Sequence, residues 1–77
     1  MPRFFFNCEG YENFRDETGT VLPNLAEAQS ECIRTAGEIL RNHPGDFVDH
    51  PSWRVHVADD AGKVLFELHV SARAPAG

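Results

Sequence analysis

The sequence predicts an α+β fold in which one amphipathic helix packs on one face of a small antiparallel sheet of three to four strands, in the order β-β-α-β-β. Three observations lead to this fold. Apolar and polar residues alternate near the start of the chain, an apolar stripe at helical spacing occupies the middle, and two alternating runs flank a turn near the end. An isolated hairpin is marginal in water and an amphipathic helix needs an apolar surface, so the helix is expected to cover the sheet.

The first part of the chain predicts two strands and a short extended piece. Residues 3–8 form the first strand, because apolar side chains there recur at every second position: Phe4, Phe6 and Cys8. Gly10 offers a turn, after which residues 11–16 are expected to return as a short second strand. Residues 16–19, Asp-Glu-Thr-Gly, have the acidic first residue and terminal glycine of a type I turn, and residues 20–22 continue as an extended piece.

The middle of the chain predicts one helix from Asn24 to about Asn42. Asn24 is a favourable N-cap, and Glu27 completes the spacing of a capping box. Pro44 ends the helix, because a proline disfavours the helical conformation of the residue before it. Apolar residues at three- and four-residue spacings form a single stripe: Leu25, Ala28, Cys32, Ala36, Ile39 and Leu40, widened by Ile33. We therefore expect one face of the helix to pack on the sheet and the other to face water.

The last third of the chain predicts a loop followed by a β-hairpin. Residues 43–52 contain a Pro-Gly pair and a second proline, which predict an irregular loop with a type II turn. Two runs then alternate around an Asp-Asp-Ala-Gly turn: Trp53, Val55 and Val57, and afterwards Val64, Phe66, Leu68 and Val70. We expect a register in which Val57 faces Val64 on the apolar side and Arg54 faces Glu67 on the polar side.

At 77 residues the chain is long enough for one small domain. We assign residues 1–71 to this domain and expect residues 72–77 to be a disordered tail. A chain of this size buries only about 60% of the surface that its unfolded state exposes, so the core is small. Self-association adds buried area, and we expect a homodimer or an unknown protein partner.

Composition argues against nucleic-acid and membrane partners. Seven Lys and Arg residues against twelve Asp and Glu give a net charge of −5, and the cations are scattered. Nucleic-acid affinity depends on clustered cations. No apolar run approaches the roughly 20 residues that span a bilayer, and the opening MPRFFFNCEG lacks the layout of a signal peptide, which predicts a cytoplasmic protein. Cys8 and Cys32 are too few and too widely spaced for a disulfide framework or a zinc site.

The sequence contains no motif that predicts catalysis or a cofactor. Asp16 and Glu17 form an acidic pair, but a general acid or base needs a pocket and a partner that shifts its pKa. The serines and cysteines lack the neighbours that activate a nucleophile. In the predicted loop, His43, His50 and Asp46 are the residues that a cation would use. We expect them to be polar loop residues and expect no metal.

A second surface remains when the helix covers one face of the sheet. Phe5 and Leu65 are then left on the outer face, and a contiguous apolar patch there would favour self-association. The candidate interaction face consists of Phe5, Asn7, Arg54, His56, Leu65 and Glu67. The favoured function is a non-catalytic protein-interaction or oligomerisation module. The alternatives are a nucleic-acid-linked, antitoxin-like regulator and a small metal-binding protein or enzyme.

The chain resembles a family of short bacterial proteins, common in alphaproteobacteria and particularly in rhizobial relatives, that is classed as a domain of unknown function. The matching stretches are the opening MPRFFFN, the central DETGTVLPNLAEAQSE and the final WRVHVADDAGKVLFEL, which together cover most of the chain. The loop HPGDFVDHPS departs from the family's pattern. The resemblance implies a bacterial cytoplasmic protein with a compact helix-and-sheet fold, and it implies no catalytic residue, cofactor or ligand.

Overall fold

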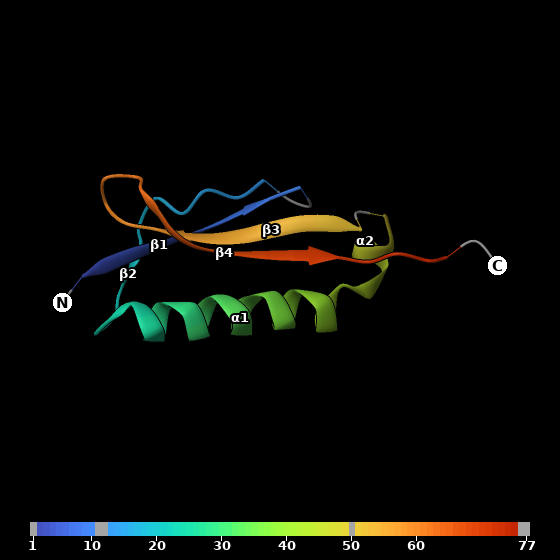
Figure 1. Cartoon of the computed structure of the whole chain (residues 1–77), viewed down its shortest axis with the longest axis horizontal. Coiled ribbons are helices and arrows are strands. Elements are labelled where there is room, and N and C mark those ends of the chain that lie inside the picture. Colours follow the sequence, from blue (N-terminus) through green and yellow to red (C-terminus); the bar gives the residue numbers. More distant parts are fainter. Residues whose placement is uncertain (1, 11–12, 50, 76–77) are drawn as a thin grey trace.

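The chain folds into a sheet with one long helix packed on it. The computed structural model describes residues 2–10, 13–49 and 51–75. Its elements are β1 (Arg3–Glu9), β2 (Thr20–Val21), α1 (Leu25–Asn42), α2 (Pro44–Asp49), β3 (Ser52–Ala58) and β4 (Val64–Ser71). Figure 1 shows α1 lying along the sheet, with the short helix α2 near one end of the molecule. The predicted α+β fold, with its long helix between two pairs of strands, is confirmed.

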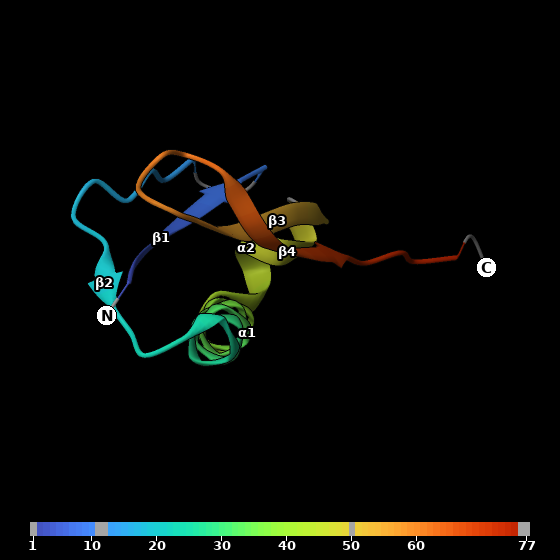
Figure 2. The ribbon, with the colours of Figure 1, turned by 60° about the vertical axis from the view of Figure 1, so that its left-hand side comes forward.

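The sheet is antiparallel, and its strands lie in the order β2-β1-β3-β4. β2 pairs only with the start of β1, where Arg3 faces Val21 and Phe4 faces Thr20. Figure 2, in which α1 is seen nearly end-on, shows the helix on a single side of the sheet. We call the side that α1 covers the inner face and the opposite side the outer face.

The core lies between α1 and the inner face. The helix contributes the small buried residues Ala28, Cys32 and Ala36, which let it approach the sheet closely. The sheet contributes larger buried side chains: Phe4, Cys8, Trp53, Val55 and Val57. These are the faces that the alternation and the helical stripe predict. Both cysteines are buried thiols, and burial raises the pKa of Cys32.

Helix α1 begins and ends where the sequence predicts. The Asn24 side chain accepts a hydrogen bond from the backbone N–H of Glu27 at 2.9 Å, which satisfies one of the N–H groups that a helix start leaves unpaired. At the other end, the N–H of His43 donates to the C=O of Ile39 at 2.9 Å. The apolar stripe faces the sheet, with Ile33 at its margin 54% exposed.

The region after α1 is not the irregular loop that we predicted, because residues 44–49 form helix α2. Pro44 occupies the first helical position, where its missing N–H is not needed and its fixed φ suits the helix. Gly45 lacks the positive φ that a type II turn requires after its proline. The Pro-Gly pair therefore starts a helix instead of forming a turn. His50 lies outside the described residues.

The β3–β4 hairpin forms as predicted, but its register is displaced by two residues. Val57 faces Phe66 and not Val64, and the predicted pair of Arg54 with Glu67 is displaced in the same way. A shift of two residues keeps apolar positions opposite apolar positions, since side chains alternate with a period of two. The hydrophobic pattern therefore does not distinguish the two registers.

The physical cause of the shift is a β-bulge beside the turn. Ala58 faces Val64, whereas the next described pair joins Val57 to Phe66, so Leu65 is an extra residue on β4. Leu65 is half-buried and packs against the core. The bulge thus turns a side chain toward the inner face that regular alternation assigns to the outer face.

The first part of the chain pairs differently from the prediction. The second strand lies at residues 20–21, within the predicted extended piece. The described part of the predicted strand at residues 11–16 makes one isolated bridge, from Phe14 to Cys8, and Tyr11 lies outside the described residues. The chain bends within the predicted turn at residues 16–19, where the N–H of Gly19 donates to the Asp16 carboxylate and Gly19 has a φ of +76°. At the other end, the disorder of the tail stays a prediction.

Candidate functional site

The centre of the outer face is occupied by polar side chains from three strands. The strand pairing places these side chains in two adjacent rows, Glu9-Arg54-His69 and Asn7-His56-Glu67, each running across β1, β3 and β4. Four of the predicted interaction residues, Asn7, Arg54, His56 and Glu67, therefore share this face. The structure adds Glu9 and His69 to them.

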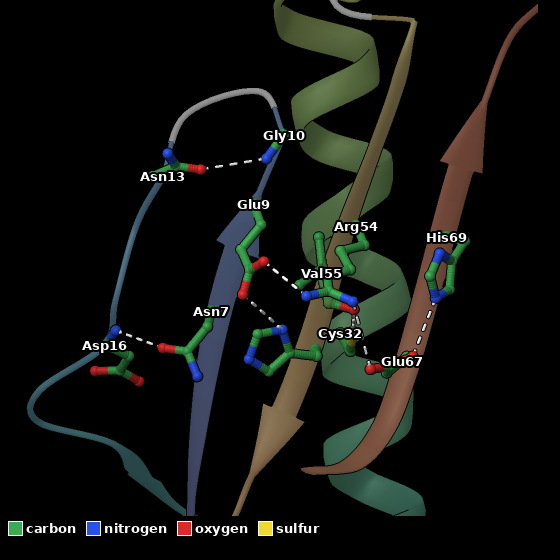
Figure 3. A network of polar contacts seen from close by, with 11 residues as sticks. Asn7, Glu9, Gly10, Asn13, Asp16, Cys32, Arg54, Val55, Glu67 and His69 are labelled. Carbon is green, nitrogen blue, oxygen red and sulfur yellow. Dashed lines mark hydrogen bonds and ion pairs between the residues drawn. The ribbon is translucent and has the colours of Figure 1, made fainter. Parts of the chain in front are cut away.

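Ion pairs connect the two rows. Arg54 Nη2 lies 2.7 Å from Glu9 Oε2, and Arg54 Nη1 lies 3.8 Å from Glu67 Oε1. His69 Nε2 lies 3.0 Å from Glu67 Oε2 (Figure 3). One arginine between two carboxylates leaves this face close to neutral or slightly acidic. We call Glu9, Arg54, Glu67 and His69 the polar ladder.

The polar ladder shifts the protonation equilibria of its members. The hydrogen bond to Glu9 raises the pKa of Arg54, and the charges of Glu9 and Glu67 add to this shift. The hydrogen bond from His69 lowers the pKa of Glu67, with a further contribution from the charge of Arg54. These groups are exposed to solvent, where ion pairs contribute little to stability. The ladder therefore fixes side-chain positions on the surface more than it stabilises the fold.

His56 lies beneath this surface and not on it. Its exposed fraction is only 9%, and its Nδ1 atom is buried without a hydrogen-bond partner among the described residues. Glu9 Oε1 is 4.0 Å from that nitrogen, which is too far for a hydrogen bond. His56 therefore offers little contact area to a partner, although the sequence placed it correctly on the outer face.

The two apolar residues of the predicted interaction face do not form a patch. Phe5 is half-buried, and a Cβ atom placed on Gly19 would lie 2.9 Å from the Phe5 ring. The turn at Gly19 therefore lies directly against Phe5. Leu65 is directed to the core by the bulge. Phe5 and Leu65 are therefore not neighbours in one apolar patch. Phe5 instead shares a row with Ala58 and the 44% exposed Val64, beside the polar ladder.

Residues 13–19, which we call the covering segment, close the free edge of β1. Phe14 and Cys8 exchange two backbone hydrogen bonds of 2.9 Å, and Asn7 Oδ1 accepts from the N–H of Asp16 at 2.8 Å (Figure 3). Asp16 Oδ2 in turn accepts from the N–H of Phe6 at 3.2 Å. The N–H and C=O of Cys8 and the N–H of Phe6 are thereby paired with the covering segment.

Asp16 is the central residue of the covering segment. Its Oδ1 atom accepts hydrogen bonds from the N–H groups of Thr18 at 3.0 Å and Gly19 at 2.9 Å. Burial is the largest single influence on its pKa and raises it, but the N–H donors of Gly19, Phe6 and Thr18 together outweigh burial and lower the pKa. A carboxylate engaged by three backbone donors is a structural group, so the turn role predicted for it is supported over an acid–base role.

The opposite edge of the sheet is open. β4 is the last strand in the sheet order, and within the described residues no further strand pairs with it. Its inward side chains, Phe66, Leu68 and Val70, are only half-buried, whereas the outward Glu67 and His69 are exposed. The structure therefore has one covered edge and one edge of eight residues with unpaired main-chain groups.

Several hollows flank β1, and two of them contrast in character. The larger, of about 400 Å³, lies between the covering segment and the β3–β4 turn and is lined mostly by polar groups. The smaller, of about 260 Å³, is apolar and lies between β1 and α1, where Phe6, Cys8 and Ile39 contribute to its wall. In the larger one the Asp16 carboxylate is already engaged by backbone donors, so it is not available as a base. Cys8 and His43 both line the apolar hollow, and the Cys8 thiol is buried there.

The described residues do not assemble a metal site. His43 Nδ1 lies 3.7 Å from Asp46 Oδ2, and both side chains are more than half exposed. His50 is outside the described residues, and no group of three potential ligands occurs within them. Among the described residues, no helix is both long enough and apolar enough to cross a membrane.

The predicted interaction face omitted Glu9, and it omitted His69 although alternation places His69 on the outer face; Asp16 was predicted for the turn but not for its contact with β1. The signal for Glu9 was present, because it continues the outward series of Phe5 and Asn7 by one further alternation. His69 continues the outward series of β4 in the same way. No local signal identified the contact of Asp16 with β1, because its carboxylate reaches a strand ten residues earlier in the chain.

These features define a small helix-on-sheet domain with one covered and one open sheet edge. The chain belongs to the family described as Domain of unknown function (DUF6894), whose model matches residues 3–71. The predicted membership of an unknown-function family is thereby confirmed. No curated protein and no solved structure matches the chain.

Proposed function

We propose that this protein is a non-catalytic self-association module that pairs through the open edge of β4. The observation that carries the proposal is the difference between the two edges of one sheet. The covering segment pairs the edge of β1 within the chain, whereas the edge of β4 has no such cover among the described residues. Unpaired strand edges are templates for pairing with another chain.

The size of the domain supports the same proposal. A small domain buries a limited fraction of its apolar surface, and here Phe66, Leu68 and Val70 on the inner face of β4 remain half-buried. A strand added beside β4 covers these side chains and pairs the main-chain groups at the same time. A homodimer is the simplest assembly that both covers these side chains and pairs these main-chain groups.

The alternatives have less support. The cation at the centre of the outer face, Arg54, is already paired with Glu9 and Glu67, so this face offers little to nucleic-acid phosphates. A cytoplasmic location is part of our proposal and agrees with Cys8 and Cys32 being buried thiols.

Sedimentation equilibrium of the whole chain tests the proposal. We expect a monomer–dimer equilibrium for the wild type and a shift to monomer for His69→Pro, because proline removes a main-chain donor from the edge. His69→Gln is the matched control, since it keeps the main-chain N–H and also a side-chain N–H that can donate to Glu67, so we expect it to dimerise more tightly than His69→Pro. Near-ultraviolet circular dichroism of Trp53 checks that each variant is folded, and Ser71→Pro replaces His69→Pro if that variant is not. A wild type that stays monomeric at millimolar concentration contradicts the proposal, as does a folded proline variant that dimerises as tightly as the wild type.

A further inference from the structure

The hydrogen bonds of the hairpin determine which residues of β4 direct their main-chain groups outward. The N–H of Ala72 donates to the C=O of Pro51 at 2.7 Å, so this pair is a hydrogen-bonded one. In an antiparallel ladder, hydrogen-bonded and non-hydrogen-bonded pairs alternate. Val70, Leu68 and Phe66 therefore bond to β3. The N–H and C=O groups of Glu67, His69 and Ser71 point away from the sheet.

Only certain registers allow a second copy to pair with this edge. A two-fold axis perpendicular to the sheet must bring outward main-chain groups of one copy opposite outward groups of the other. The axis then passes through Glu67, Leu68 or His69 if most of β4 is to be paired. The residue at the axis determines which side chains face each other across the new strand pair.

Electrostatics selects among these registers. An axis at Glu67 places two Glu67 carboxylates directly opposite each other, which is destabilising. An axis at His69 leaves Glu67 opposite Ser71 and pairs a shorter part of the strand. An axis at Leu68 places Glu67 of each copy opposite His69 of the other, so that a carboxylate faces an imidazole that can donate to it at two positions. The contact that Glu67 and His69 already make within one chain, at 3.0 Å, shows that the two side chains are compatible neighbours.

The inner face fits the same register. With Leu68 at the axis, the two Leu68 side chains face each other, and Phe66 faces Val70 of the second copy. All three are apolar and half-buried in the single chain. Each such pair is a non-hydrogen-bonded one, in which the side chains approach most closely.

Helix α1 adds an apolar margin on the side of this edge. Thr35 and Ile39 line the hollow beside β1, so that flank of the helix faces β1. Ile33 and Leu40 lie on the opposite flank at helical spacing, toward β4. Because a perpendicular axis keeps both helices on the same side of the joined sheet, the 54% exposed Ile33 faces the second copy.

Resting on the proposed self-association, we infer that the occupant of the β4 edge is a second copy of this chain, paired antiparallel with Leu68 opposite Leu68. The two sheets then join into one continuous sheet with both helices on its inner side. Reciprocal Glu67–His69 pairs on the outer face set the register. Reciprocal apolar pairs on the inner face bury the side chains of β4 that one chain leaves half-exposed.

Cysteine cross-linking of full-length variants tests this register. Leu68→Cys is expected to form an intermolecular disulfide under mild oxidation, because the Cα atoms of such a pair are about 4.5 Å apart, within the range of a disulfide. Phe66→Cys is the matched control on the same strand and face. It lies opposite Val70 of the second copy, and its own equivalent is about 13 Å further along the strand. A mixture of Phe66→Cys and Val70→Cys is expected to cross-link. Peptide mapping distinguishes these bonds from any that involve Cys8 or Cys32.

Charge reversal provides a second test that leaves the core unchanged. His69→Glu places carboxylates opposite Glu67 at two positions, and we expect dimerisation to weaken about tenfold. Combining it with Glu67→Lys restores opposite pairs and is expected to recover most of the affinity.

The outcomes separate the register from the proposed function. Cross-linking of Leu68→Cys together with rescue by the double charge variant supports the inference. Cross-linking of Phe66→Cys or Val70→Cys to its own equivalent, or a wild-type dimer in which none of the variants cross-links, overturns the register and leaves self-association in place. A wild-type chain that is monomeric by sedimentation overturns the proposed function and the register with it.

Discussion

The two edges of the sheet carry the same kind of main-chain groups, but the described chain covers only one of them. At the edge of β1, the covering segment supplies backbone partners from Phe14 and a carboxylate from Asp16. At the edge of β4, the described chain continues as an exposed tail and supplies no partner strand. Natural proteins protect exposed edges against pairing with other chains. A chain that protects one edge and leaves the other open has a specific place at which to add a strand.

The difference also shows how closely edge protection depends on a few side chains. The covering segment has little regular secondary structure, yet it follows β1 because Asn7 and Asp16 bond to backbone groups across the gap. On β4, the exposed side chains of Glu67 and His69 bond to each other and leave the main chain beside them unpaired. The predictions that follow alter one edge at a time.

Proline substitution at adjacent positions of β4 gives the largest expected effect. Leu68→Pro removes a ladder hydrogen bond to β3, so we expect the free energy of unfolding to fall by about 3 kcal/mol or more. His69→Pro removes an outward N–H, and we expect the monomer to lose only about 1 kcal/mol, mainly through backbone strain. Urea denaturation at low protein concentration, followed by Trp53 fluorescence, measures both. Equal losses in the two variants mean that the outward and inward groups of β4 are assigned wrongly.

Removal of the Asp16 carboxylate opens the covered edge. Asp16→Ala deprives the N–H groups of Phe6, Thr18 and Gly19 of their acceptor, and we expect a loss of about 2 kcal/mol, given that the site is partly exposed. Faster hydrogen exchange is expected at Phe6 and Cys8. Glu17→Ala is the matched control and is expected to change stability by less than about 0.5 kcal/mol. If hydrogen exchange at Phe6 and Cys8 is unchanged in Asp16→Ala, other contacts hold the covering segment on β1.

The turn that carries the covering segment depends on a glycine. Gly19 has a φ of +76°, and an added Cβ atom would lie 2.8 Å from Arg3 Cγ. We expect Gly19→Ala to lower the free energy of unfolding by about 1–2 kcal/mol. Gly37→Ala is the control, because Gly37 lies in α1 with open space around it, and we expect it to stabilise the protein by about 0.5–1 kcal/mol. Thermal melts of both variants give the comparison, and a neutral Gly19→Ala argues against a fixed turn.

Acid pH weakens the covered edge and gives the smallest expected effect. The pKa of Asp16 is lower in the folded chain than in the unfolded one, so its stabilising contribution is fully present above the unfolded value of about 4. That contribution is lost as the pH falls from about 4 through the folded pKa. Asp16→Asn is expected to flatten this part of the pH dependence, which denaturation between about pH 2 and pH 6 measures. If the free energy of unfolding falls as steeply with pH in Asp16→Asn as in the wild type, the acid sensitivity belongs to other carboxylates.

Much of the fold was predictable because its signals are local or periodic. The helix from Asn24 to Asn42 follows from a cap, a stripe and a proline, and all three act within a few residues. Of the predicted interaction face, Asn7, Arg54 and Glu67 lie where alternation placed them. The register of the hairpin and the direction of Leu65 were not predictable, because a two-residue shift preserves the pattern and a bulge has no periodic signature.

The sequence by itself determined the faces of the strands and the limits of α1, since these depend on side-chain periodicity and on backbone groups a few residues apart. Only the tertiary structure decided which edge of the sheet is covered. That outcome depends on Asp16 reaching the N–H of Phe6, a contact between residues on separate segments. Contacts of this kind depend on how the chain returns along the sheet, which residue types and spacings do not specify. The open edge of β4, where we propose that a second copy binds, is a consequence of that same arrangement.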